Sequence, residues 1–184
     1  MFKVKPFLIK VVVATLAFSF LALNPTQAAT AIPKRIISLS PSATEILYAI
    51  GAGNQVIAVD DLSNYPSTAP ITKLSAFSPN VEALMNYKPD LIILNADATK
   101  ALEVKAALEK LKVKVFLESA PSSPREAYLE IAALGRATGK LSGAQKVISE
   151  MKSKISAAIK SGKTTKKITF FHELDNTLYT ATSD

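Results

Sequence analysis

The sequence predicts an α/β fold: a parallel-sheet lobe with helices on both faces, a long connecting helix, and the beginning of a second α/β lobe. Four short apolar segments rich in β-branched residues lie between residues 35 and 117, separated by helical patterns. A longer amphipathic pattern follows at 142–160, and no strand directly precedes it. Because alternating strands and helices form parallel sheets that are covered on both faces, these observations set the fold class.

The N-terminal segment, residues 1–28, is predicted to be a secretory signal peptide. A basic start is followed by an uncharged apolar run from Val11 to Leu23, which Asn24 and Pro25 interrupt before small residues at 26–28. A bilayer span takes about 20 residues, so this run is short for a membrane anchor, the alternative reading. No Cys follows it that could carry a lipid. We therefore expect a secreted protein, periplasmic or at the cell surface, soluble after cleavage.

The first strand and helix are predicted from Arg35 to about Ile50. The β-branched run Arg35–Leu39 ends at Ser40-Pro41, as expected for a buried strand. Ser42 and Glu45 have the spacing of a capping box, which gives Glu45 a structural role at the helix start. Glycines at 51 and 53 end this helix, and Val56–Val59 is the next strand.

The middle of the chain repeats the strand and helix pattern. Residues 60–79 are predicted to be a long polar loop, and a short helix follows from Asn80 to Tyr87. Residues 91–94 form the next strand, and the helix at 99–111 leads to the strand at 113–117.

The last elements define the domain organisation. Ser123, Pro124 and Glu126 predict a second capping box, whose helix runs to about Thr138. Short strands are expected at 167–171 and 178–181; alone they would leave an apolar face bare, so we expect a second lobe that is incomplete here. The predicted parts are an N-terminal lobe at 32–140, a connecting backbone helix at 141–161, and the start of a C-terminal lobe at 166–184.

Composition excludes several functional classes. The chain has no Cys and one His, which rules out a disulfide scaffold, a Cys-ligated zinc site and a thiol nucleophile. His172, Glu173 and Asp175 lack the further ligands that a transition metal needs, so no metal site is expected. The net charge of +7 includes a lysine cluster at 160–167 that is typical of a solvated turn, and no nucleic-acid partner is expected.

Four motifs in order resemble a known family. They are Arg35 to Glu45 (RIISLSPSATE), Asn64-Tyr65-Pro66, Asn80 to Leu84 (NVEAL), and Lys88 to Ile92 (KPDLI). Residues 34–184 thereby resemble the helical-backbone (cluster A-II, class III) periplasmic substrate-binding proteins of ABC importers. The resemblance implies capture of a ferric siderophore, corrinoid (cobalamin) or haem and its unchanged delivery to a permease dimer in the cytoplasmic membrane. It implies no enzyme activity and no cofactor. The alternative is a secreted enzyme on a related two-lobe scaffold, with its catalytic residues in the missing C-terminal half.

Candidate site residues follow from the same pattern. In open α/β sheets, ligands bind outside the carboxyl ends of the strands, where this chain carries short polar segments. The resemblance places ligand-contacting aromatics in the loop after the second strand, where Phe77 is a candidate and Tyr65 is expected to pack the loop. It also implies that Glu82 pairs with an arginine of the permease. The predicted ligand-binding residues are Ser40, Pro41, Ser42, Asp61, Leu62, Phe77 and Asn95.

Overall fold

The computed structural model describes residues 31–162. The chain divides into two units, Met1–Ile32 and Pro33–Asp184, and the second is described here by itself. The predicted signal peptide, the two strands expected after residue 166 and the group at 172–175 lie outside the described residues.

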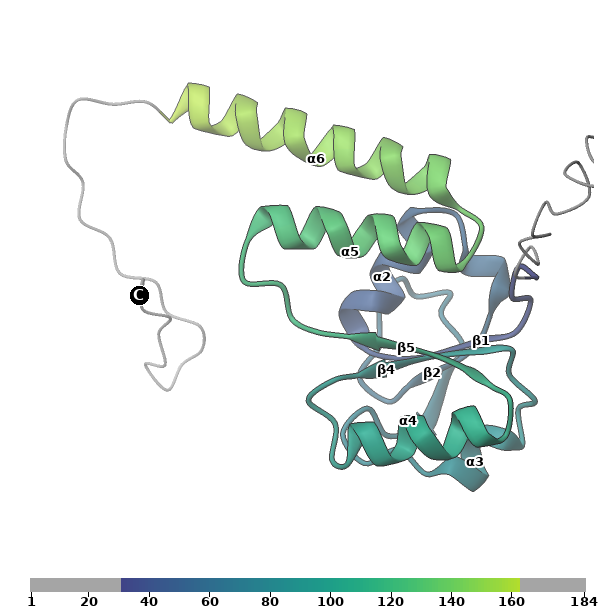
Figure 1. The fold of residues 1–184 in the computed structure, drawn as a ribbon. Coiled ribbons are helices and arrows are strands. Elements are labelled where there is room, and N and C mark those ends of the chain that lie inside the picture. Colours follow the sequence, from purple (N-terminus) through teal and green to yellow (C-terminus); the bar gives the residue numbers. More distant parts are fainter. Residues whose placement is uncertain (1–30, 163–184) are drawn as a thin grey trace, which may run out of the picture. The chain divides into compact units, whose positions relative to one another are not determined.

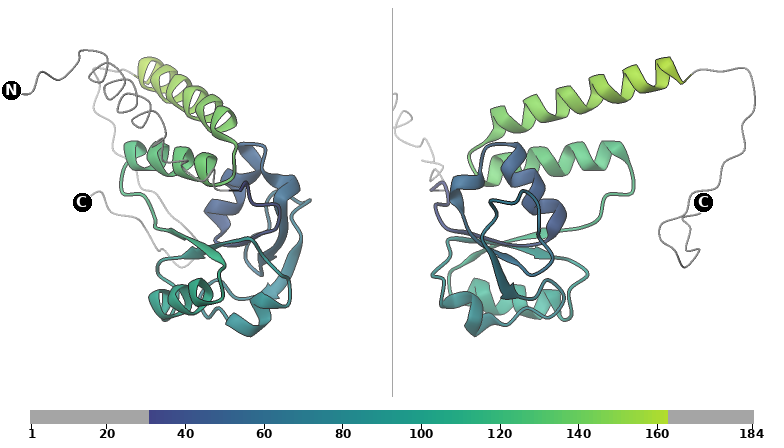
Figure 2. Two further views of the ribbon diagram at one scale, coloured as in Figure 1. Left: turned by 45° about the vertical axis from the view of Figure 1, so that its right-hand side comes forward. Right: turned by 180° about the vertical axis from the view of Figure 1, so that it is seen from behind.

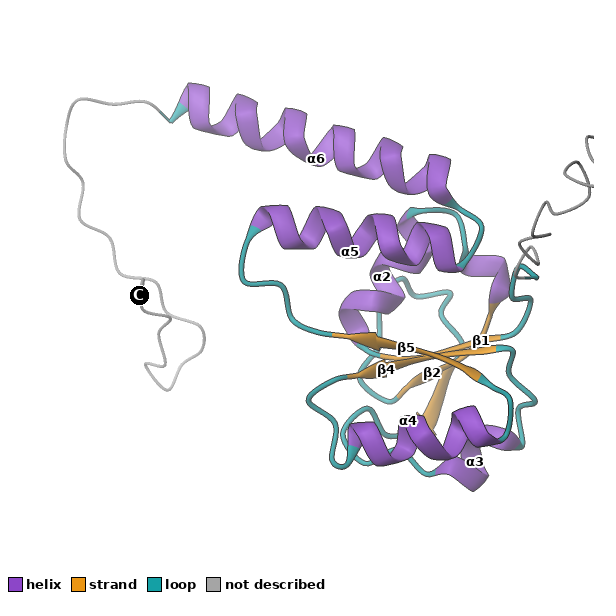
Figure 3. Cartoon of the chain, viewed as in Figure 1, coloured by secondary structure: helices purple, strands orange, loops and turns teal. Residues whose placement is uncertain are grey.

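Five parallel strands form one sheet in the order β3-β2-β1-β4-β5. Their bounds are β1 Ile36–Leu39, β2 Val56–Asp60, β3 Ile71–Leu74, β4 Leu91–Asn95 and β5 Lys114–Glu118. Strands β1 and β4 are buried along almost their whole length, as expected for the centre of a sheet that is covered on both faces (Figure 3). The predicted parallel sheet is confirmed.

Strand β3 corrects the prediction that residues 60–79 form only a loop. It lies at the edge of the sheet beside β2, and Ile71 and Lys73 are exposed while Leu74 is buried. An edge strand that is largely exposed lacks the continuous apolar run from which the other strands were predicted. Pairing with β2 therefore makes residues 71–74 a strand, and their own sequence gives little indication of it.

Helices cover both faces of the sheet (Figure 1). One layer contains α2 (Pro41–Ala49), α5 (Pro124–Ala137) and α6 (Leu141–Ser161), and a 3-10 turn (Gly53–Gln55) follows α2. The other layer contains α3 (Val81–Met85) and α4 (Ala101–Lys110). The crossovers through α2 and α4 lead in opposite directions from the sheet centre, so right-handed connections place these helices on opposite faces.

The start of α2 differs from the predicted capping box. The N-cap is Ser40, whose hydroxyl accepts a hydrogen bond from the backbone N–H of Ala43, and Pro41 occupies the first helical position. Ser42 is therefore inside the first turn, and Glu45 is exposed one turn further on. The predicted helix end is confirmed, because Gly51 follows it with a φ of 84°, a left-handed conformation that suits glycine.

The second predicted cap is confirmed at α5. The Ser123 hydroxyl accepts from the N–H of Glu126, and Pro124 is the first helical residue. The Glu126 carboxylate, however, accepts hydrogen bonds from the backbone N–H and hydroxyl of Ser122, one residue before the cap. These bonds lower the pKa of Glu126, because they stabilise its charged form.

The turn before β4 has a structural role that explains part of the Lys-Pro-Asp motif. The Asp90 carboxylate accepts hydrogen bonds from the backbone N–H groups of Lys34 and Arg35, at 2.8 and 3.0 Å. The Arg35 guanidinium in turn donates to the carbonyl oxygens of Tyr87 and Lys88. These bonds join the beginning of β1 to the segment that enters β4.

Helix α6 begins against the lobe and continues beyond it. It packs along α5, as both views of Figure 2 show, and Ala144, Val147 and Met151 contact the core formed with α2. Gly143 lies against the backbone of Ile50, so close that a Cβ at this position would overlap the Ile50 carbonyl group. The final turns of α6 are exposed. The predicted long helix at 141–161 is confirmed.

Candidate functional site

The carboxyl ends of the five parallel strands form the candidate site. The chain leaves the sheet centre toward β2 on one side and toward β5 on the other, so the topological switch point lies between β1 and β4. Ligands of open α/β sheets bind outside the strand ends at such a point. Ser40 follows β1 directly and Asn95 ends β4, so two predicted site residues flank this position.

Strand register brings three polar residues of this edge to one face. Leu39 is paired with Leu94, and Asn95 with Glu118, so Ser40, Asn95 and Glu118 form the next row across the sheet. Side chains alternate along a strand, and the residues two positions earlier, Ile93 and Phe116, pack against the core beneath α2 and α5. All three polar side chains therefore project toward the α2 and α5 side.

Glu118 connects this row to the start of α2. It is 3% exposed, and its two carboxylate oxygens accept hydrogen bonds from the Ser40 hydroxyl at 2.9 Å and the Ser42 hydroxyl at 2.8 Å. Ser40 is itself buried, so its hydroxyl is committed to Glu118 and to the helix cap. Ser42 is exposed and 3.0 Å from Ser40 between the two hydroxyl oxygens. Among the predicted serines, Ser42 is the one that a ligand can reach.

A second buried polar cluster shapes the loop after β2. The Asp60 carboxylate accepts from the backbone N–H groups of Leu62 and Ser63, at 2.8 and 3.1 Å. The Ser63 hydroxyl also lies 3.1 Å from that of Thr44 in α2. The predicted ligand-binding residues include Asp61 and not Asp60; in the structure the buried Asp60 forms the turn, whereas Asp61 is exposed.

Three large apolar side chains are exposed in the loops that follow β2 and β3. Leu62 is 49% exposed, Tyr65 64% and Phe77 54%. The backbone of Phe77 is fixed to the loop after β4, because its carbonyl oxygen accepts from the N–H of Thr99 at 2.7 Å. Tyr65 was expected to pack its loop against the lobe, but its ring is largely exposed, so this expectation was wrong.

The other predicted residues occupy distinct places. Pro41 is partly buried at the first position of α2, and Asn95 is partly buried with its side-chain oxygen accepting from the Asp97 N–H at 2.8 Å. Glu82 is exposed in the first turn of α3, where the Asn80 side chain accepts from the Ala83 N–H. A carboxylate at that position is favoured by the helix dipole and remains free to meet a partner in solvent.

Glu130 is a site residue that sequence analysis missed. It lies on α5 three residues after Ala127 and one before the buried Ile131, so a carboxyl group occurs on the apolar side of an amphipathic helix. A carboxyl group at an apolar position of the helical pattern was the feature of the sequence that could have identified Glu130. Glu130 lines a hollow of about 480 Å³ between α2, α5 and α6, together with Ser42 and Tyr65. Burial, followed by the nearby negative charge of Glu118 and a hydrogen bond with it, raises the pKa of Glu130 to about 7.

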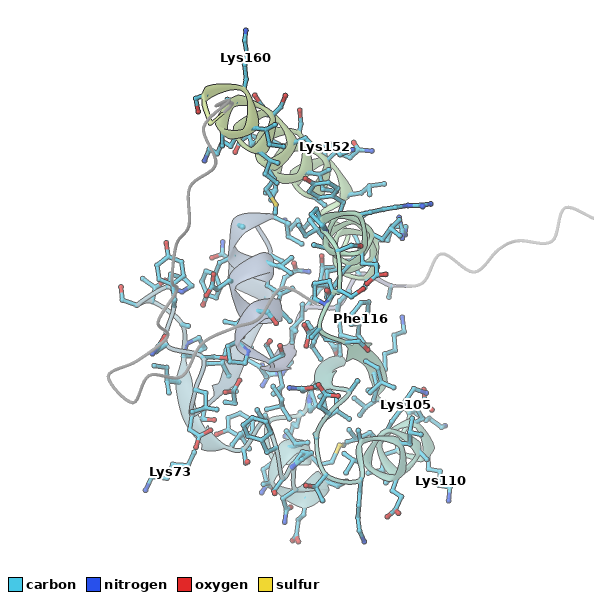
Figure 4. All side chains as sticks on the ribbon, turned by 90° about the vertical axis from the view of Figure 1, so that its left-hand side faces the viewer. Lys73, Lys105, Lys110, Phe116, Lys152 and Lys160 are labelled. Atoms are coloured by element: carbon cyan, nitrogen blue, oxygen red, sulfur yellow. The ribbon has the colours of Figure 1, made fainter. Side chains whose placement is uncertain are left out.

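The lysines labelled in Figure 4 are distributed over three elements: Lys73 lies on β3, Lys105 and Lys110 on α4, and Lys152 and Lys160 on α6, with Lys152 over the ring of Tyr128. Within residues 31–162, no group of three acidic, histidine or cysteine side chains is arranged to hold a metal ion. None of the helices in that same stretch is long and apolar enough to cross a membrane.

Comparison with known proteins gives the family. The sequence profile of the periplasmic binding protein family matches residues 36–184. An uncharacterized ABC transporter substrate-binding lipoprotein of Bacillus subtilis, YvrC, is 32% identical over 139 residues, 73% of this chain and 44% of that protein. A vitamin B12-binding protein of Vibrio vulnificus is 40% identical over 91 residues, 48% of this chain and 33% of the other.

A solved structure agrees with these sequence matches. It is a possible iron-binding, periplasmic solute-binding protein of Staphylococcus epidermidis, with a TM-score of 0.67 and 30% identity over 74% of this chain and 54% of the other. This chain thus spans about half, or less, of the length of the proteins it matches. From the profile match over most of its length, the chain belongs to the periplasmic binding protein family.

Proposed function

We propose that this chain provides one wall of the ligand site of an extracytoplasmic solute-binding protein of an ABC importer, and that the ligand is a bulky chelate: a ferric siderophore, a haem or a corrinoid. The observation that supports it most is the exposure of three large apolar side chains, Leu62, Tyr65 and Phe77, in the loops that follow β2 and β3. Such side chains in solvent are typical of a surface that binds a partner or ligand.

The chemistry of this edge suits a large ligand with flat faces. Aromatic rings such as Tyr65 and Phe77 can stack on a macrocycle or a chelating group, and each offers a broad apolar contact. Ser42 and Asn95 add hydrogen-bonding groups nearer the switch point. Among relatives, one is named a vitamin B12-binding protein and another a possible iron-binding protein, which supports this class of ligand.

Delivery requires a second contact, with the permease. The exposed carboxylate of Glu82 is suited to a charge-assisted pair with an arginine, which orients a transient complex more than it adds affinity. A relative named as an ABC transporter substrate-binding lipoprotein supports a permease partner and a place outside the cytoplasm. The named relatives are binding proteins, so the alternative of an enzyme gains no support from them.

Titration of the purified protein with haemin, cyanocobalamin and ferrichrome tests the ligand class. We expect saturable binding of one of the three, followed by absorbance or by quenching of tyrosine fluorescence. Phe77→Ala should weaken that binding about fivefold, because a stacked ring contributes on the order of 1 kcal/mol. The matched control is Leu111→Ala. Leu111 is about as exposed as Phe77, but it follows the C-terminal end of α4, whereas Phe77 is bonded to the segment that precedes the helix. Equal affinity of the two variants, or no saturable binding of any of the chelates, would contradict the proposal.

The permease contact has its own test. Glu82→Arg should abolish the stimulation of ATPase activity that the protein produces in its permease reconstituted with the ATP-binding subunits, while chelate binding stays unchanged. The control is Glu103→Arg, a charge reversal at an exposed helical glutamate on α4. If both reversals have the same effect, Glu82 has no special role in docking.

A further inference from the structure

Glu118 and Glu130 are neighbouring carboxyl groups at the carboxyl edge of β5, because Ser42, which donates a hydrogen bond to Glu118, lines the same hollow as Glu130. Glu118 is almost fully buried, and Oε1 of Glu130 is a buried oxygen with no hydrogen-bond donor in the described part of the chain. Ionised carboxylates only accept hydrogen bonds. Two carboxyl groups can therefore remain in contact only when one of them is protonated, because its O–H then donates a hydrogen bond to the other.

The surroundings favour one negative charge over two. From α2, the acidic Glu45 faces the same hollow, and the uncharged Tyr65 lines it from the loop. Helix α6 contributes the apolar side chains of Val147 and Met151.

Apart from Glu130, the charged side chains of α5 and α6 are exposed. On α5, Glu126 and Arg136 line the hollow on the other side of Glu130, and Arg136 is exposed. On α6, Lys146 lies 3.9 Å from Glu150, and Lys152 is above the ring of Tyr128. The described structure thus shows no cation paired with Glu118 or Glu130, and a second negative charge would be repelled without compensation.

We propose that Glu118 and Glu130 share one proton and act together as positioning residues for Ser40 and Ser42, which makes the geometry of the candidate ligand edge dependent on pH. The role of this edge in binding rests on the function proposed above, but the shared proton does not. With one proton in the pair, Glu118 holds both serine hydroxyls, and through Ser40 it supports the cap of α2.

Loss of the proton places two repelling charges side by side. Glu130 is the residue that moves, because its helix borders an open hollow, whereas Glu118 is fixed by two hydrogen bonds. When Glu130 moves, the positions of the exposed Ser42 and of the neighbouring wall of the hollow change as well. A protonated carboxyl is replaced most closely by an amide, so Glu130→Gln mimics the state with one proton and can still donate to Glu118.

The experiment is a pH titration of the full chain, labelled with ¹³C at the glutamate carboxyls and ¹⁵N at the backbone, followed by NMR without ligand. We expect one carboxyl transition with a midpoint near pH 7, matching the pKa of about 7 at Glu130. The amide signals of Ser42 and Ala43 should shift with the same midpoint. In Glu130→Gln both transitions should disappear, and in the control Glu45→Gln, which removes an exposed carboxyl from the same hollow, both should persist.

A second measurement gives the direction in which folding stability changes with pH. The folded state binds this proton more tightly than the unfolded chain, so the stabilisation is complete below pH 4.5 and is lost as pH rises through about 7. The urea midpoint of the wild type should fall between pH 5 and pH 8, and that of Glu130→Gln should fall less. The proposal is overturned if all glutamate carboxyls titrate below pH 5.5, if the transition near pH 7 survives in Glu130→Gln, or if the amides at 42 and 43 do not follow it. Because no chelate is present, these outcomes are independent of whether the proposed ligands bind.

Discussion

Gly143 allows a direct test of how α6 is attached to the lobe. The substitution Gly143→Ala involves two opposing effects. Alanine favours a helix over glycine by about 1 kcal/mol, which would stabilise α6. Against this, the new Cβ would lie 2.9 Å from the carbonyl carbon of Ile50 and closer still to its oxygen, and both belong to the backbone at the end of α2.

The steric effect is expected to be larger. Overpacking costs about 1–3 kcal/mol, and a backbone carbonyl cannot rotate away as a side chain can, so the upper end of this range applies. Relief requires α6 to shift from α2, which loosens the packing of the fully buried Ala144. We expect a net loss of about 2 kcal/mol, which lowers the urea midpoint by about 1 M for a protein of this size.

The assay is urea unfolding followed by circular dichroism at 222 nm. Ser149→Ala is the control, because Ser149 is exposed in the same helix and alanine there should leave stability unchanged or raise it by up to about 0.5 kcal/mol. If Gly143→Ala is as stable as the wild type or more stable, the close contact between α6 and Ile50 is not present in solution, and the account of how the long helix is attached is refuted.

Three further substitutions, the first with a matched control, test the fold beneath the site. Leu108→Ala, which truncates a fully buried side chain of α4, should lower the free energy of unfolding in urea by about 3 kcal/mol, whereas Leu102→Ala on the same helix, 72% exposed, should change it by less than about 0.5 kcal/mol. Asp90→Ala removes the acceptor of two backbone N–H groups just before β1 and should lower the free energy of unfolding by about 1–2 kcal/mol; an unchanged midpoint would show that this connection does not matter. Ser40→Ala removes both the cap of α2 and one donor to Glu118, and should cost about 2 kcal/mol by thermal unfolding, with wild-type stability as the contradicting result.

The elements that sequence analysis located correctly are those specified by neighbouring residues. The cap at Ser123, the proline at the start of α5 and the left-handed Gly51 are local signals, and each occurs at the predicted position. Strand β3 is different. Its residues are mostly exposed, and it is a strand because the backbone of β2 lies beside it, which is information from outside the segment.

The candidate site shows the same division. That polar residues gather at the carboxyl ends follows from strand order and alternation, and Ser40, Asn95 and Glu118 are indeed neighbours in register. That Glu118 meets Glu130 depends on how α5 packs on β5, which no local pattern fixes. A carboxyl group on the apolar side of a helix was the one available signal, and its partner could not be named without the structure.

The buried carboxylate of Glu118 at the end of β5 limits which residues at this edge can change in evolution. Burying an ionised carboxylate is costly unless its oxygens receive hydrogen bonds, and Glu118 receives them from two hydroxyl groups of the Ser-Pro-Ser segment. Replacing either serine with an apolar residue therefore affects stability before it affects any ligand. The side chains of Leu62 and Phe77 carry no such constraint, because both are exposed and Leu62 contacts the buried Asp60 only through its backbone N–H. Under the function proposed above, ligand preference can therefore change at the exposed apolar positions, while the serine and glutamate positions remain fixed by the fold.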